Sequence, residues 1–178
     1  MARAGQIEPA RLVLDQISGN ATTQPVIIQI AQAQALTGLV PEAIETAYET
    51  GPDIAPEIEL LLSLWHITPD PRFVAALRDI LDRTDANHRH RRFALFAMSI
   101  VDPKPEYAAE IEEILSNTDR ESGQAFEYPH DAISLLCAAG RYSDALALVL
   151  AERPENVGRR VLSLNRIALC LSEDPLRT

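Results

Sequence analysis

One short pattern recurs along this 178-residue chain at nearly constant spacing, and it constrains the fold more than any other feature. A glycine is followed two positions later by an apolar residue and five positions later by an alanine, in segments 5–10, 38–43 and 140–145. Two degenerate copies that lack the glycine surround Ala75 and Ala109, so consecutive alanines lie 32 to 36 residues apart. A fixed period of this length indicates stacked helical repeats.

Hydrophobic periodicity predicts which segments are helical. Apolar residues recur at i, i+3, i+4 and i+7, which is typical of amphipathic helices, and long period-2 alternation with hairpin dipeptides is missing. Prolines such as Pro25, Pro41, Pro56 and Pro129 fall at the starts of the periodic segments, where a missing N–H costs nothing. The sequence therefore predicts an all-α fold with first helices at about 24–37, 56–67, 88–101, 128–139 and 159–172. The alanines lie on second helices, the earliest of which is expected at about 7–18.

The pattern resembles tetratricopeptide repeats, whose first helix carries three apolar residues and one small residue at fixed positions. These positions match Phe93, Phe96, Ala97 and Ile100, and also Leu164, Ile167, Ala168 and Leu171. Ile27, Ile30 and Ala31 match, but Gln34 stands where the family has an apolar residue. Ala132, Ile133 and Leu136 match, as do Ile58, Leu61, Leu62 and Trp65 with a large residue at the small position. The resemblance covers nearly the whole chain, although the family's first-helix Trp and Tyr are mostly absent; a related helical solenoid is the alternative.

The resemblance implies a right-handed superhelix of about five helix pairs, forming a single domain over residues 1–178 that starts and ends in mid-repeat. The last predicted helix, 161–171, is apolar on most faces, so it is not the polar cap that a solenoid end normally carries. We therefore expect either a segment of a longer repeat protein or an end that associates with a second copy.

The family binds partners along a concave groove lined by first helices. Register carries that lining over to one set of positions, polar at both ends with an apolar floor in the middle. They are Gln29, Gln32, Glu59, Ser63, His66, Arg91, Leu95, Met98, His130, Asp131, Ser134, Asn165 and Arg166. Such a groove suits a short extended or helical peptide. The family's lysine-based clamp for a C-terminal carboxylate is not expected, because the first helices hold no lysine, although Arg91 and Arg166 could pair with a carboxylate.

Charge narrows the class of partner. The chain has 16 Lys and Arg against 26 Asp and Glu, a net charge of -10, which disfavours affinity for nucleic acid or for anionic membranes. An RNA-binding helical repeat is disfavoured for the same reason. No stretch approaches 18 apolar residues and no signal peptide is evident, so no membrane insertion and a cytoplasmic location are expected by default.

Two charged features have both a structural and a functional interpretation. Cations in segment 88–92 oppose the dipole at a helix start, so either Asp79, Asp82 and Asp85 compensate them or an anionic partner does. Acidic runs at 42–59 and 102–119 are either solvated helix faces or docking surfaces for a basic partner.

No residue pattern indicates catalysis. His130, Asp131 and Ser134 lack a nucleophile elbow, and adjacent helix positions point in different directions. His88 and His90 also point apart, and Cys137 and Cys170 fit neither a metal site nor a disulfide framework. We expect no enzyme, no cofactor and no metal. The predicted function is a scaffold that holds a peptide or partner subunit; the alternative is a structural spacer or a self-associating segment.

Overall fold

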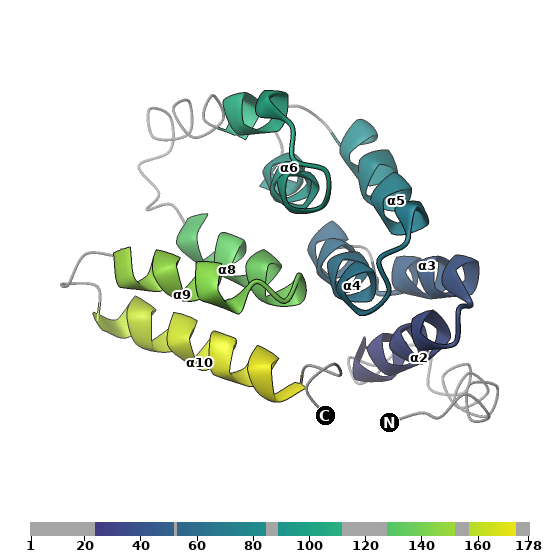
Figure 1. Ribbon diagram of the computed structural model, residues 1–178, viewed down its shortest axis with the longest axis horizontal. Helices are drawn as coiled ribbons and strands as arrows, with labels where there is room; N and C mark the ends of the chain where they lie inside the picture. The colour runs from purple at the N-terminus through teal and green to yellow at the C-terminus, as the bar shows by residue number, and fades with distance from the viewer. Residues whose placement is uncertain (1–23, 52, 85–88, 112–127, 152–156, 174–178) are drawn as a thin grey trace. The chain divides into compact units, whose positions relative to one another are not determined.

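A computed structural model shows that all regular secondary structure in the described residues is α-helical (Figure 1). The structure describes residues 24–51, 53–84, 89–111, 128–151 and 157–173, except for the side chains of residues 89, 128–131, 159 and 173. Contacts divide the chain into two compact units, Met1–Leu77 and Arg78–Thr178, here called unit 1 and unit 2. The all-α prediction is confirmed for the described residues; the expected helix at 7–18, with Ala10, lies outside them.

Unit 1 is built from α2 (Gln24–Leu36), α3 (Val40–Tyr48), α4 (Ile54–Ile67) and the first half of α5 (Pro71–Asp82). α2 packs against both α3 and α4, and α3 also packs against α4 (Figure 1). The core contains Ile30 and Ala31 of α2, Ala43 of α3 and Leu61 of α4, each at most 1% exposed. The predicted first helices at 24–37 and 56–67 are confirmed, with bounds that differ by at most two residues.

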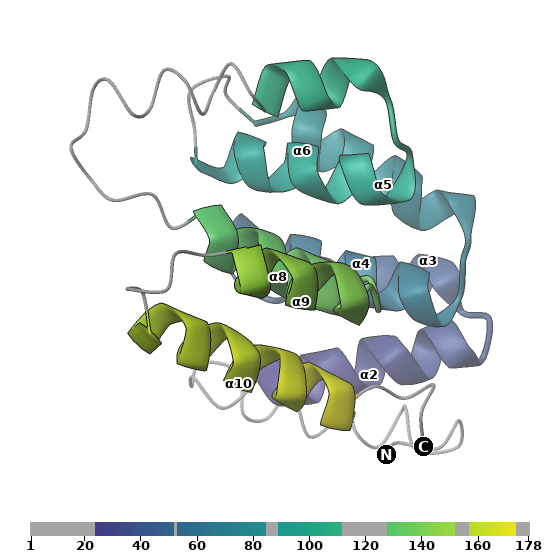
Figure 2. The ribbon, with the colours of Figure 1, turned by 60° about the vertical axis from the view of Figure 1, so that its left-hand side comes forward.

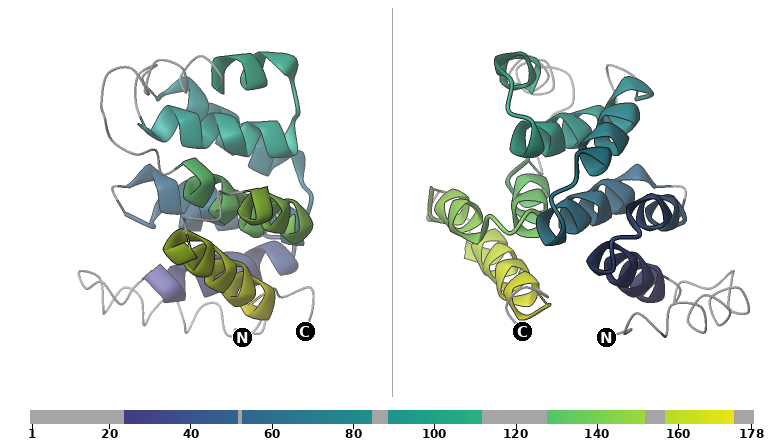
Figure 3. Two further views of the ribbon diagram at one scale, coloured as in Figure 1. Left: turned by 90° about the vertical axis from the view of Figure 1, so that its left-hand side faces the viewer. Right: turned by 45° about the vertical axis from the view of Figure 1, so that its right-hand side comes forward.

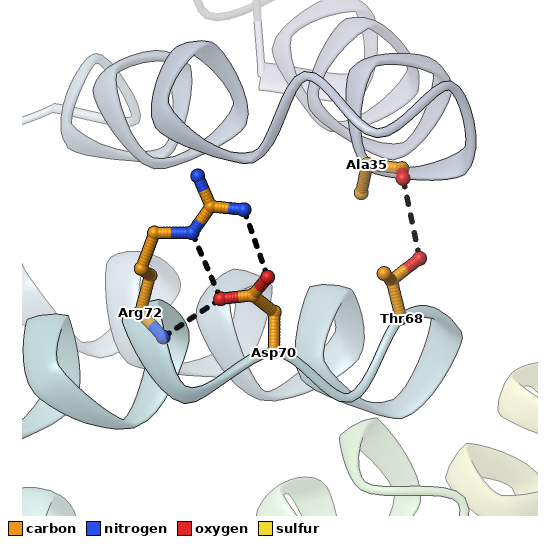
Figure 4. Close-up of polar contacts among 4 residues, drawn as sticks. All are labelled: Ala35, Thr68, Asp70 and Arg72. Carbon is orange, nitrogen blue, oxygen red and sulfur yellow. Dashed lines mark hydrogen bonds and ion pairs between the residues drawn. The ribbon is translucent and has the colours of Figure 1, made fainter.

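A polar contact fixes the level at which these two first helices end (Figure 4). The hydroxyl of Thr68, just after α4, donates a hydrogen bond of 3.2 Å to the carbonyl of Ala35 near the end of α2. These two residues are 33 positions apart, close to the spacing of the repeat. The contact therefore joins the C-terminal ends of α2 and α4.

Unit 2 contains α6 (Arg89–Val101), a helical segment at 105–111, α8 (Tyr128–Ala138), α9 (Tyr142–Ala151) and α10 (Val157–Glu173). α8, α9 and α10 pack against one another, and α6 packs against α8 (Figure 2). Their shared core contains Ile133, Leu136, Cys137, Ala145, Val149 and Ile167, and the partly buried Cys170 packs against it. Cys137 is buried and Cys170 partly buried, and both pack here as small apolar residues.

The turns at the two glycine motifs that the structure describes have the same hydrogen bonds. In the first, the N–H groups of Gly38 and Leu39 donate to Ala35 and Gln34. In the second, those of Gly140 and Arg141 donate to the residues three and five positions earlier, as in the first. Both glycines have positive φ, +81° and +70°, a conformation that residues with a Cβ adopt at a cost. This left-handed helix end explains why the pattern begins with glycine.

The alanine of the motif lies in the core in the two intact copies that the structure describes, but not in the degenerate copies. Ala43 and Ala145 have no exposed area, whereas Ala75 and Ala109 are exposed. In α5 the buried alanine is Ala76, 7% exposed and 33 residues after Ala43. The register predicted for the third copy was thus wrong by one residue, because no turn glycine marks where α5 begins.

Candidate partner-binding surfaces

The N-terminal part of the predicted groove retains exposed surface on two adjacent helices. Gln29 and Gln32 are on α2, which packs against α4. The side chain of Gln29 is exposed and that of Gln32 is partly exposed. The positions predicted on α4 are all partly exposed: Glu59, Ser63 and His66. Five of the thirteen predicted residues therefore form a polar set on neighbouring first helices of unit 1, which we call the α2–α4 set.

An ion pair lies just beyond the end of α4 and fixes the start of α5 (Figure 4). The carboxylate of Asp70 accepts hydrogen bonds from the backbone N–H of Arg72 at 2.9 Å and from the guanidinium at 2.9 and 2.8 Å. The guanidinium hydrogen bonds, followed by the backbone hydrogen bond, lower the pKa of Asp70 from 3.8 to about 2. The same carboxylate raises the pKa of Arg72. Asp70 thus acts as an ionised helix cap over the ordinary pH range.

The described part of unit 1 is strongly acidic. It carries seven carboxylates and one base, Arg72, which leaves an excess of six negative charges. The carboxylates belong to Glu42, Glu45, Glu49, Asp53, Glu57, Glu59 and Asp70. Because Asp70 already pairs with Arg72, the remaining acids set the electrostatic potential of this unit.

Arg91 is used inside unit 2. Its Nε donates to the carboxylate of Glu110 at 2.5 Å, and its Nη1 donates to the carbonyls of Leu81 and Thr84 at 3.2 and 3.1 Å. The guanidinium therefore supplies hydrogen-bond donors to two carbonyls at the end of α5 and links this end to the helix at 105–111. For Arg91 this favours the structural interpretation of the basic cluster, with Glu110 as the acid that pairs with it. We correct the prediction that Arg91 serves a partner's carboxylate.

The predicted apolar floor of the groove is buried. Leu95 and Met98 have no exposed area, and Ser134 is 7% exposed. These side chains pack in the interior, so we correct their assignment to a binding surface; the register identified the helices but not which of their faces is covered. The side chains of His130 and Asp131 lie outside the described residues.

The last two predicted residues belong to α10, where Asn165 is exposed and Arg166 is partly buried. Five large apolar side chains of this helix are also 43% to 64% exposed: Val157, Val161, Leu162, Leu164 and Leu169. Figure 3 shows that, among the described helices of unit 2, α8 and α9 lie on one side of α10 only. The apolar composition of this helix was visible in the sequence, but which positions remain uncovered was not.

In the part of the chain that the structure describes, no three His, Cys, Asp or Glu side chains come together as metal ligands. No helix in the described ranges has both the length and the apolar character needed to cross a bilayer.

No protein-family model, curated protein or solved structure matches this chain. Its function must therefore be argued from its own residues.

Proposed function

We propose that this chain is a non-enzymatic interaction module in which unit 1 binds a basic peptide segment of another protein along α2 and α4. The observation that carries the proposal is the α2–α4 set, five polar side chains that keep exposed surface on two adjacent first helices. The Gln29 and Gln32 amides each offer donors and an acceptor, so they can pair with both the N–H and C=O groups of an extended chain.

Charge supports a basic segment over an acidic one. Glu59 belongs to the α2–α4 set, and the described part of unit 1 has an excess of six negative charges. Such a field speeds the approach of a cationic partner and repels an anionic one. Arg72, the one basic residue in the described part of unit 1, is paired with Asp70, so the other carboxylates of this part keep their excess negative charge.

The wider proposal is that the helix pairs stack as a tetratricopeptide-like right-handed superhelix. Its supports are the matching turns at Gly38 and Gly140, the contact of α2 with α4, and the 33-residue separation of Ala35 from Thr68. A single domain over residues 1–178 remains part of this proposal.

The test is fluorescence anisotropy with labelled pools of short basic, neutral and acidic peptides. We expect the basic pool to bind, with an affinity that falls as salt is added. Glu59→Lys and Gln32→Ala should each weaken binding by about tenfold or more. The control is Glu45→Lys, which makes the same charge change at an exposed position of α3, outside the α2–α4 set. It should weaken binding by no more than about threefold.

Two outcomes would contradict the proposal. If no pool binds, unit 1 has no such peptide site. If Glu45→Lys weakens binding as much as Glu59→Lys, the chain attracts cations generally, and the α2–α4 set forms no specific surface.

A further inference from the structure

None of the described positions of α10 that are exposed carries a charged side chain. Its exposed positions are Val157, Gly158, Val161, Leu162, Leu164, Asn165, Ala168, Leu169 and Ser172. The described arginines of the helix, Arg160 and Arg166, are partly buried. A surface helix normally presents charged or polar residues on its outer face, whereas a helix that is apolar all round is normally covered.

Within this surface, apolar and small residues occupy positions that are symmetric about Asn165. Three and four positions on either side lie apolar residues, Leu162 and Val161 before it and Ala168 and Leu169 after it. Seven positions away on either side are small residues, glycine before and serine after. Spacings of three, four and seven place all of these residues on one face of the helix.

We propose that α10 pairs with α10 of a second copy of this chain, antiparallel, about a two-fold axis at Asn165. A two-fold interface brings one surface patch against itself, so position 165+k faces position 165−k of the other copy. Leu162 then faces Ala168 of the second copy, large against small. Val161 faces Leu169 of that copy, and the glycine and serine at the two ends let the helices approach closely.

The central asparagine fits this arrangement. In paired helices a single buried Asn selects one register and a two-stranded state, because its amide has a partner only when it faces its equivalent. Asn165 is exposed in the single chain, and on the axis its amide would meet its symmetry mate.

The available area suits a second copy. Three large apolar side chains of this face, Val161, Leu162 and Leu169, are 48% to 64% exposed, so pairing removes apolar area of both copies from water. Because the described exposed positions of α10 are uncharged, two acidic chains can bring these faces together without direct repulsion. The interface lies on unit 2 and uses none of the residues of the α2–α4 set.

Sedimentation velocity over a range of concentrations tests the pairing. We expect the 178-residue chain to reach twice its 19.6 kDa mass. Leu162→Lys and Ala168→Glu should each raise the dimer dissociation constant at least about tenfold, because each sets a charge against an apolar residue. The double variant should return to within about threefold of the wild type, because each Lys then faces a Glu of the second copy.

The matched control is Leu36→Lys on unit 1, whose leucine is 58% exposed against 64% for Leu162. It should leave the dimer unchanged, and circular dichroism should show wild-type helix content in every variant. A wild-type chain that remains monomeric overturns the proposal, whatever else binds α10. Single variants that weaken the dimer without rescue in the double variant overturn the antiparallel register, since a parallel pair would set like residues against each other.

Discussion

The hydroxyl of Thr46 in α3 donates a hydrogen bond of 2.8 Å to Oε1 of Gln34 in α2, and both side chains are only 1% exposed. Gln34 occupies a first-helix position where the tetratricopeptide pattern has an apolar residue. A buried amide is tolerated at this point because the second helix of the same pair supplies a donor. The buried amide of Gln34 therefore has its hydrogen-bond donor within unit 1.

This pair gives a double-mutant prediction. Thr46→Val and Gln34→Met should each lower the free energy of unfolding by about 1–3 kcal/mol, since each leaves the other polar group buried without its partner. The double variant should be more stable than the sum of the two losses predicts, because no buried polar group remains unsatisfied. Urea denaturation of the four proteins measures this coupling. Strictly additive losses would show that the hydrogen bond contributes nothing.

The Asp70–Arg72 pair predicts a titration. The pKa of Asp70, about 2 against an ordinary 3.8, should be visible by carbon NMR of its carboxyl. Because the folded-state pKa is the lower one, the pair stabilises the fold above about pH 3.8, and this contribution disappears as pH falls towards 2. Arg72→Ala should raise the pKa part of the way back, since the backbone hydrogen bond remains. Arg78→Ala is the control, because Arg78 pairs with Asp102 instead and should leave Asp70 unchanged.

Arg91 should behave as a structural residue. Arg91→Ala removes donors to Glu110 and to the carbonyls of Leu81 and Thr84, and should cost about 1–3 kcal/mol of unfolding free energy. Arg91→Lys should recover only part of this, because an ammonium cannot reproduce the fork of guanidinium donors. Thermal denaturation would rank the three proteins. Peptide binding by unit 1 should be unaffected, and a loss of binding in a folded Arg91→Ala protein would contradict the structural assignment.

The turn glycines give a conformational prediction. Gly38→Ala should destabilise the fold by about 1–2 kcal/mol, although nothing lies within 4 Å of the added Cβ, because φ is +81°. Gly38→Asn should cost less, since asparagine tolerates this region better. Equal losses for the two variants in chemical denaturation would mean that crowding, and not backbone conformation, sets the cost.

Much of the fold could be predicted from the sequence, and the reason is local. Glycine at a left-handed helix end, proline in a first turn and alanine at a tight helix crossing act within one or two turns. Ala43 and Ala145, which follow Gly38 and Gly140, are buried as predicted; where no glycine marks the turn, the buried alanine is Ala76 and not the predicted Ala75.

The candidate site was less predictable because exposure depends on what packs against a helix. Leu95 and Met98 occupy groove positions in the family pattern, yet other residues cover them completely. Arg91 was identified as unusual, but its acceptor, Glu110, is 19 residues away and no spacing rule points to it. The symmetric spacing about Asn165 can be read from the sequence. It indicates a pairing surface only because the structure shows that these positions of α10 are exposed.

The repeated turn has a practical consequence for engineering. Residues 37–43 and 139–145 share only the glycine and the final alanine, yet their backbones make the same hydrogen bonds. The glycine sets the backbone conformation of the turn, and an apolar residue two positions later and the final alanine complete the motif; the other residues differ between the two segments. Replacing residues 37–43 with the sequence of residues 139–145, or the reverse, should therefore leave the helices on either side of the turn in place.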